Sequence, residues 1–286
     1  MTNDTLFLPP AIDIAISLVA LGAVVFLVTR VVRRSARVRP VDVDWLAGGL
    51  ATGLTQPVYQ AYLRRHWRLR TLGFLVGMAV AVVGAIRWPG DTVFSISVGN
   101  GPIGTDLLVC LLAGATIGTL AAETYRLGTR HSPRRQARLE ARPSRPQPKL
   151  NWTARAIAAA AIVPATLGTM VMGKPDPIGG ALLAVTIVIL AEATQAAITD
   201  RRRFPNSLVD DVDQRLRAFA GRSVAWLELS GAVLGFGWSL SAFEPADPWA
   251  ELGMVTARLA CLIVAIVALL RSSGRAPRHW QPMVAT

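Results

Sequence analysis

Catalytic and metal-binding side chains are scarce in this sequence. It has two cysteines and three histidines among 286 residues, and no two histidines have the spacing of a metal site such as H-E-x-x-H. Neither a G-x-S-x-G nucleophile turn nor a G-x-x-x-x-G-K-S/T phosphate loop is present. We therefore expect no enzymatic site, no metal and no cofactor.

Lysine is also nearly absent, and arginine carries most of the positive charge. Only Lys149 and Lys174 are lysines, while the formal net charge is +12. A nucleic-acid-binding protein gathers basic residues on one folded soluble face, whereas here they separate long apolar segments. We therefore expect no nucleic-acid partner. The preference for arginine is typical of a GC-rich bacterial genome, so the expected location is a bacterial inner membrane.

Long apolar segments dominate the rest of the chain. Hydrophobic residues make up 52% of it, and a membrane-crossing helix needs about 20 mostly apolar residues. The first segment has no basic residues before it, unlike a cleavable signal peptide, and should remain as a span. The sequence thus predicts an all-α, polytopic membrane helix bundle that fills 1–286 as a single membrane domain. Its seven expected transmembrane helices are 11–29, 71–87, 103–124, 155–173, 178–198, 223–242 and 252–270.

The basic residues lie in alternate connections between these segments. Four stretches hold 27 of the 30 arginines and lysines, and cytoplasmic connections retain such residues. This pattern predicts an outside amino terminus, a cytoplasmic carboxyl terminus and a multi-pass protein of the cell membrane. The expected partners are the lipid bilayer, its anionic lipid headgroups and other membrane subunits. The expected cytoplasmic parts are an interfacial connector at 30–70, a basic, Pro/Arg-rich disordered loop at 125–154, a loop with a short helix at 199–222 and a tail at 272–286.

An internal repeat relates two parts of the chain at an offset of 75 residues. The tripeptide PIG at 102–104 recurs at 177–179, and Arg126 recurs as Arg201. The repeat predicts a lone first helix followed by three helical hairpins, of which the first two are copies. Repeats of this kind occur both in transporters and in inert bundles.

Glycines recur at four-residue spacing in three of the expected spans. Small residues at this spacing let helix backbones approach closely in lipid. We expect the glycines to pack helices within one chain rather than to form a dimer interface. The pairs are Gly73 and Gly77, Gly114 and Gly118, and Gly231 and Gly235.

Few ionisable residues fall inside the expected spans, and these form the candidate site. Such residues are costly in lipid, so they mark either function or structural pairing. Glu228 shares a helical stripe with Gly231 and Gly235, which predicts that it faces the bundle interior. Arg258 needs either a carboxylate partner, a role that both Glu192 and Glu228 suit, or a path for its side chain out of the span. The expected polar cluster, open to the cytoplasm, contains Glu123, Glu192, Gln195, Glu228 and Arg258.

Two functions from different classes agree with these patterns. An accessory or scaffolding subunit of a membrane complex needs only the bundle, its small-residue faces and its basic connections. A transporter or channel-like permease would use the Glu/Arg cluster instead. A membrane enzyme is a third class, without a motif to support it. The first two differ in whether the polar side chains surround a cavity or contact one another.

Overall fold

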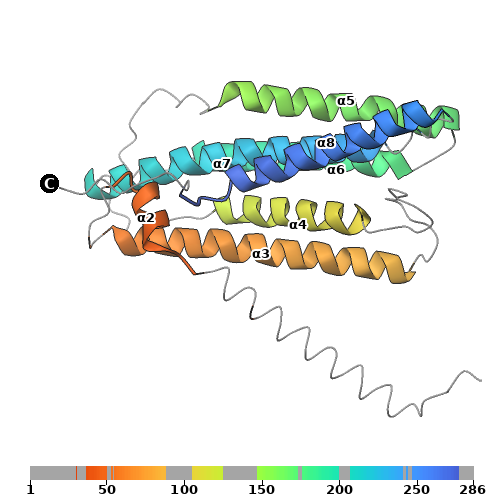
Figure 1. The fold of residues 1–286 in the computed structure, drawn as a ribbon. Helices are drawn as coiled ribbons and strands as arrows, with labels where there is room; N and C mark the ends of the chain where they lie inside the picture. Colours follow the sequence, from red (N-terminus) through yellow and green to blue (C-terminus); the bar gives the residue numbers. More distant parts are fainter. Residues whose placement is uncertain are drawn as a thin grey trace, which may run out of the picture.

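The computed structural model is all-helical over the residues that it describes, with seven helices and no strand there (Figure 1). The long helices lie side by side, and the short α2 (Pro40–Leu46) crosses them at one end. The long helices are α3 (Gln56–Arg87), α4 (Thr105–Glu123), α5 (Pro148–Met172), α6 (Asp176–Thr199), α7 (Ser207–Ser239) and α8 (Pro248–Arg271). The described residues are 30, 37–49, 53, 55–87, 105–124, 147–172, 176–199, 207–240, 243 and 247–276.

Three of the described helices are long and apolar enough to cross a membrane. They are Pro148–Val171 in α5, Pro177–Thr199 in α6 and Pro248–Arg271 in α8, while Leu108–Glu123 in α4 is apolar but shorter. The expected first span at 11–29 lies outside the described residues. The described part of the chain therefore indicates a membrane protein, but it does not establish the seven-span bundle expected from the sequence.

The helices α3 and α7 are much longer than the spans expected within them. They have 32 and 33 residues, which at about 1.5 Å per residue gives roughly 50 Å, against a hydrocarbon thickness of about 30 Å. Charged segments expected in the connector at 30–70 and the loop at 199–222 supply the first part of each helix. No proline interrupts α7, and none interrupts α3 after Pro57, so neither helix is broken where the chain turns from charged to apolar.

Successive long helices form antiparallel hairpins that start at the same end of the bundle. Tyr62 near the start of α3 contacts Glu123 at the end of α4, and Asn151 near the start of α5 contacts Gln195 near the end of α6. The helices α7 and α8 pack as a third pair. Because α6 packs against α7 as well, the arrangement of three hairpins after a lone first helix stays a prediction, and so does a close superposition of the first two hairpins.

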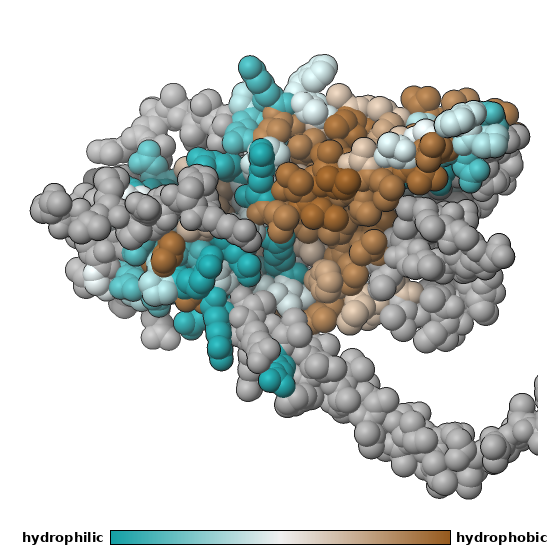
Figure 2. Space-filling view, in the orientation of Figure 1, coloured by the Kyte–Doolittle hydropathy of each residue, from teal (hydrophilic) through white to brown (hydrophobic). Residues whose placement is uncertain are grey.

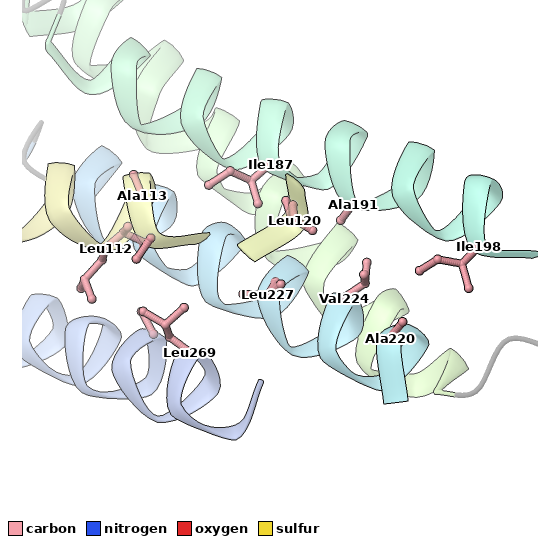
Figure 3. Close-up of a cluster of buried hydrophobic side chains, with 13 residues drawn as sticks. Leu112, Ala113, Leu120, Ile187, Ala191, Ile198, Ala220, Val224, Leu227 and Leu269 are labelled. Atoms are coloured by element: carbon pink, nitrogen blue, oxygen red, sulfur yellow. The ribbon is translucent and has the colours of Figure 1, made fainter. Parts of the chain in front are cut away.

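The helix α7 is central to the bundle. It packs against α4, α5, α6 and α8, and every residue from Leu227 to Gly235 is buried. Apolar side chains of α4, α6, α7 and α8 form one core (Figure 3), and α5 packs with α6 and α7 in a second. A methyl group added to Gly231 would overlap Ile187 of α6. A helix surrounded in this way keeps small residues where its neighbours approach.

The helices α3 and α4 approach one another backbone to backbone. A methyl group on Gly73 would overlap the carbonyl oxygen of Gly114, and one on Gly77 would overlap that of Cys110. Gly118 faces the backbone of α3 in the same way. The glycine pairs of these two helices therefore form the packing surface that their spacing predicts.

The surface of the bundle is divided along its length. Hydrophobic residues cover its middle, whereas hydrophilic residues gather at the end where α2 lies (Figure 2). Large apolar side chains are exposed on several helices, among them Val76, Met170, Leu182 and Ile263. Lipid acyl chains solvate such a surface, while water does so at a high cost in free energy.

We expect Gly77→Ala to destabilise the fold, because its methyl group would overlap backbone atoms of α4. Overpacking of this kind lowers the free energy of unfolding by about 1–3 kcal/mol. Gly253→Ala in α8 is the matched control, since nothing lies near its added methyl group, and it should change stability by at most about 1 kcal/mol, upward. Unfolding in mixed micelles measures both variants. Equal effects would contradict the close contact of α3 with α4.

Candidate functional site

A folded head caps the end of the bundle where α3 and α7 begin. It consists of α2, the start of α3 (56–70), the start of α7 (207–222) and the tail segment 272–276. Two glycines with positive φ, Gly48 at 65° and Gly49 at 78°, follow α2 and let the chain turn. The apolar core of the head contains Val43, Leu46, Ala47, Tyr59, Tyr62, Leu63, Val212, Leu216 and Phe219.

Burial in this core affects the ionisation of Tyr59. Desolvation raises the pKa of its hydroxyl above the ordinary value, although the nearby charge of Arg215 acts in the opposite direction. Arg215 itself donates a hydrogen bond to the carbonyl oxygen of Ala47, which ties α7 to the end of α2. The head is therefore a packed unit and not a loose connector between spans.

Three titratable side chains, Tyr62, His66 and Glu123, meet where the head joins the bundle and form a buried triad. The hydroxyl of Tyr62 donates a hydrogen bond to Oε2 of Glu123, and Nδ1 of His66 lies 3.0 Å from Oε1. The side chains of His66 and Glu123 have no exposed surface. Tyr62 and His66 are four residues apart on α3, so both reach the last residue of α4.

The aromatic ring of Phe219 in α7 covers the triad from a third helix. Its centroid lies 6.0 Å from the rings of both Tyr62 and His66. Nε2 of His66 is buried and has no hydrogen-bond partner among the described residues. A carboxylate in apolar surroundings needs a donor such as Tyr62, because an unpaired buried charge is very costly. Nδ1 of His66 and Oε1 of Glu123 lie close together but form no hydrogen bond among the described residues. The distance between Glu123 and His66 also suits transfer of a proton between them.

Sequence reasoning identified Glu123 but neither of its partners. The absence of a metal-site spacing among the histidines carries no information about a partner on another helix. One signal was present: Tyr62 and His66 are spaced at i and i+4 just before the apolar part of α3. That position is level with Glu123 once α3 and α4 form a hairpin.

Two further candidate residues, Glu192 and Gln195, are bound by α5. Nε of Arg155 donates a 2.8 Å hydrogen bond to Oε1 of Glu192, and Nη2 of Arg155 contacts the same oxygen. Near this pair, Nδ2 of Asn151 donates a buried 2.9 Å hydrogen bond to Oε1 of Gln195. These contacts hold the start of α5 against the end of α6.

Glu228 lies within α7, whereas Arg258 of α8 contacts the carboxyl end of α7. Glu228 is fully buried, in agreement with the prediction from its glycine stripe. Nη2 of Arg258 donates hydrogen bonds of 2.9 and 3.0 Å to the carbonyl oxygens of Leu240 and Phe243. Leu240 lies about 18 Å beyond Glu228 along the helix axis. Arg258 thus donates hydrogen bonds to carbonyl groups at the carboxyl end of α7, where such groups have no partner within the helix.

The contacts of Glu123, Glu192, Gln195 and Arg258 therefore fall at several separate places. Glu123 is engaged by α3, Glu192 and Gln195 by α5, and Arg258 by the end of α7. Within the described ranges, no group of three His, Cys, Asp or Glu side chains is arranged to hold a metal ion. Neither Cys110 nor Cys261 takes part in a disulfide.

No protein-family model matches this chain, and neither a curated protein nor a solved structure matches it significantly. The class of protein is therefore defined by the structure alone. It is an all-helical protein in which three described helices are able to cross a membrane, with a folded head at one end of the bundle.

Removal of the Tyr62 hydroxyl should destabilise the protein, because the buried Glu123 carboxylate then loses a donor. We expect Tyr62→Phe to lower the free energy of unfolding by about 1.5–3 kcal/mol, and to have a smaller effect in a Glu123→Gln background. The matched control is Tyr59→Phe, since Tyr59 is equally buried and makes no side-chain hydrogen bond within the described part of the chain. Unfolding of the single and double variants in detergent gives the coupling energy. A coupling below about 0.5 kcal/mol would contradict the contact.

Proposed function

We propose that this chain is a multi-pass protein of the bacterial cytoplasmic membrane and serves as an accessory or scaffolding subunit of a membrane complex. The observation that carries the proposal is the way in which polar side chains of the bundle are used. Glu123 is held by α3, Glu192 and Gln195 are held by α5, and Arg258 holds the end of α7. Contacts between neighbouring helices of this kind fix the helix positions, which is what a scaffold requires.

The proposed bundle has seven spans and an outside amino terminus. This topology is supported by the placement of 27 of the 30 basic residues in connections that it assigns to the cytoplasmic side. Support also comes from the hairpins, because the starts of α3, α5 and α7 share one end of the bundle with the ends of α4, α6 and α8. Under this topology the head lies in the cytoplasm, next to anionic headgroups.

A scaffold also needs a face on which other subunits can pack. The helix α5 lies at one edge of the bundle (Figure 1) and exposes Trp152, Val163, Met170 and Val171. Met170 is 85% exposed and Trp152 72%. Side chains of this size and polarity suit contact with a transmembrane helix of a partner, as well as with lipid.

Transport of protons or cations is the second candidate function. The observation in its favour is that Glu123, His66 and Glu228 are buried titratable groups on three different helices. Intramembrane acids of this kind form proton relays in transporters. In that case the triad would exchange protons at the cytoplasmic end, and Glu228 would act deeper in the bundle.

The proposed orientation predicts which end of the bundle reacts from outside the cell. In a chain with Cys110 and Cys261 replaced by alanine, Glu251→Cys should react with a membrane-impermeant maleimide on intact cells. Arg64→Cys should react only after the membrane is opened, because Arg64 lies in the head while Glu251 lies at the opposite end. Both positions are exposed. Reaction of Arg64→Cys on intact cells would overturn the orientation.

The two candidate functions predict different results in two measurements. In gently solubilised native membranes, an accessory subunit should run as a particle larger than the purified 30.6 kDa chain in the same detergent. In proteoliposomes, it should admit protons and cations no faster than empty liposomes do. A flux that Glu123→Gln or Glu228→Gln abolishes, and that the exposed control Glu251→Gln retains, would favour transport. A particle of unchanged size would contradict the accessory role.

A further inference from the structure

Two arginines come together where the tail crosses α3. Arg70 is half-buried and directly precedes Thr71, where the apolar part of α3 begins. The guanidinium of Arg275 lies over the ring of Trp67, with 5.3 Å between Cζ and the ring centroid. Trp67 and Arg70 are three residues apart on one helix and are therefore neighbours on its surface. Neither arginine has an acidic partner within the described ranges.

The backbone of the tail fixes Arg275 in this place. Nε1 of Trp67 donates a 2.8 Å hydrogen bond to the carbonyl oxygen of Ser273. Gly274 has a φ of 64°, which glycine adopts without strain, and it fits so closely that a methyl group there would lie 2.9 Å from Phe219. Arg275 thus follows two anchored residues.

An anchor on the other side of Arg275 engages the carboxylate of Asp42. The N–H of Ala276 donates a 3.0 Å hydrogen bond to Oδ1 of Asp42. Asp42 is fully buried, and it accepts two further 3.0 Å hydrogen bonds from Arg39. Asp42 is therefore already neutralised by Arg39 and does not compensate the charges of Arg70 and Arg275.

Among the described residues, no carboxylate forms an ion pair with either guanidinium group. Desolvation, and to a smaller degree the charge of Arg275, lower the pKa of Arg70 to about 10. Arg70 stays protonated at neutral pH, so the half-buried guanidinium of Arg70 and the exposed one of Arg275 remain two neighbouring positive charges. An anion that binds both guanidinium groups would relieve this repulsion and satisfy their donors.

We propose that Arg70 and Arg275, the latter held over the ring of Trp67, form a binding site for a phosphate group, with an anionic phospholipid as its source in the membrane. The planar donors of guanidinium match phosphate oxygens in pairs. Tryptophan at the start of an apolar helix segment is typical of the headgroup level. The choice of a lipid rests on the membrane placement proposed above, because that placement puts Arg70 at this level.

The test is a titration of the purified full-length chain in a nonionic detergent, with bound lipid counted by native mass spectrometry. The probes are phosphatidylglycerol, zwitterionic phosphatidylcholine and inorganic phosphate. We expect phosphatidylglycerol to bind, and Arg70→Gln or Arg275→Gln to weaken it at least about tenfold, the effect of one lost charge-assisted contact. Arg70→Lys keeps the charge and should recover part of the affinity.

Matched controls come from the same helix. Arg64→Gln and Arg68→Gln remove the same charge from exposed positions, and each should change the affinity less than about twofold. Equal losses in controls and site variants would overturn the proposal, because they would indicate a general attraction to positive charge. Equal binding by the wild type and by Arg70→Gln/Arg275→Gln would overturn it as well, and so would equal binding of phosphatidylcholine.

Inorganic phosphate distinguishes the two sources of the phosphate group. If it raises the Tm of the wild type but not of the double variant, and displaces phosphatidylglycerol at millimolar concentration, a phosphate site is supported and a soluble ligand is its source. If phosphatidylglycerol binds without such competition, the lipid is the source. Arg275→Gln changes only the tail after α8, so the helices should still fold. The titration measures only lipid bound to the purified chain. A negative result would therefore overturn the phosphate site without changing the outcome of the particle-size and flux measurements.

Discussion

The crowding around α7 is the constraint on which the rest of the structure depends. Four long helices pack on it, so residues along its middle cannot extend into lipid or solvent. Glycine and alanine supply the close approaches, as the contact of Gly231 with Ile187 illustrates. A polar side chain in the middle of this helix is therefore surrounded by other groups of the protein. Glu228 is the extreme case, because this ionisable side chain is fully buried in the protein, where an uncompensated charge is costly.

The polar contacts of the bundle concentrate at the end that carries the head. The triad of Tyr62, His66 and Glu123 joins α3 to α4 at that end, and the contact of Asn151 with Gln195 joins α5 to α6. The middle of the α3–α4 pair relies instead on glycines that bring the two backbones together. Directional contacts at one end and close packing in the middle specify both the register and the spacing of the helices. A rigid bundle of this design agrees with the proposed scaffolding role.

The head links the chain ends that a simple bundle would leave apart. The starts of α3 and α7 share one apolar core with α2, in which Phe219 contacts the ring of Tyr62. Gly274, in the segment after α8, packs against Phe219. This arrangement turns the tail back toward the surface where the apolar part of α3 begins. It thereby brings Arg275 to Arg70, although the two are far apart in the sequence.

The sequence by itself determined the helical class, the apolar character of the spans and the stripe that buries Glu228. These features follow from composition and from the helical period, which depend only on residues close together in the chain. Glycine spacing likewise predicted the packing surfaces of α3, α4 and α7. The extent of α3 and α7 beyond their apolar parts was not predicted, because hydropathy marks the lipid-facing portion and not the end of a helix.

Only the tertiary structure decided the partners. The sequence offered Glu192 as a carboxylate for Arg258, yet Arg155 holds Glu192, and Arg258 binds carbonyl groups at the end of α7. Glu123 found Tyr62 and His66 through the α3–α4 hairpin. Each of these contacts depends on the rotation and offset of one helix against another. Those quantities are set by the packing of many side chains at once, and no local pattern records them.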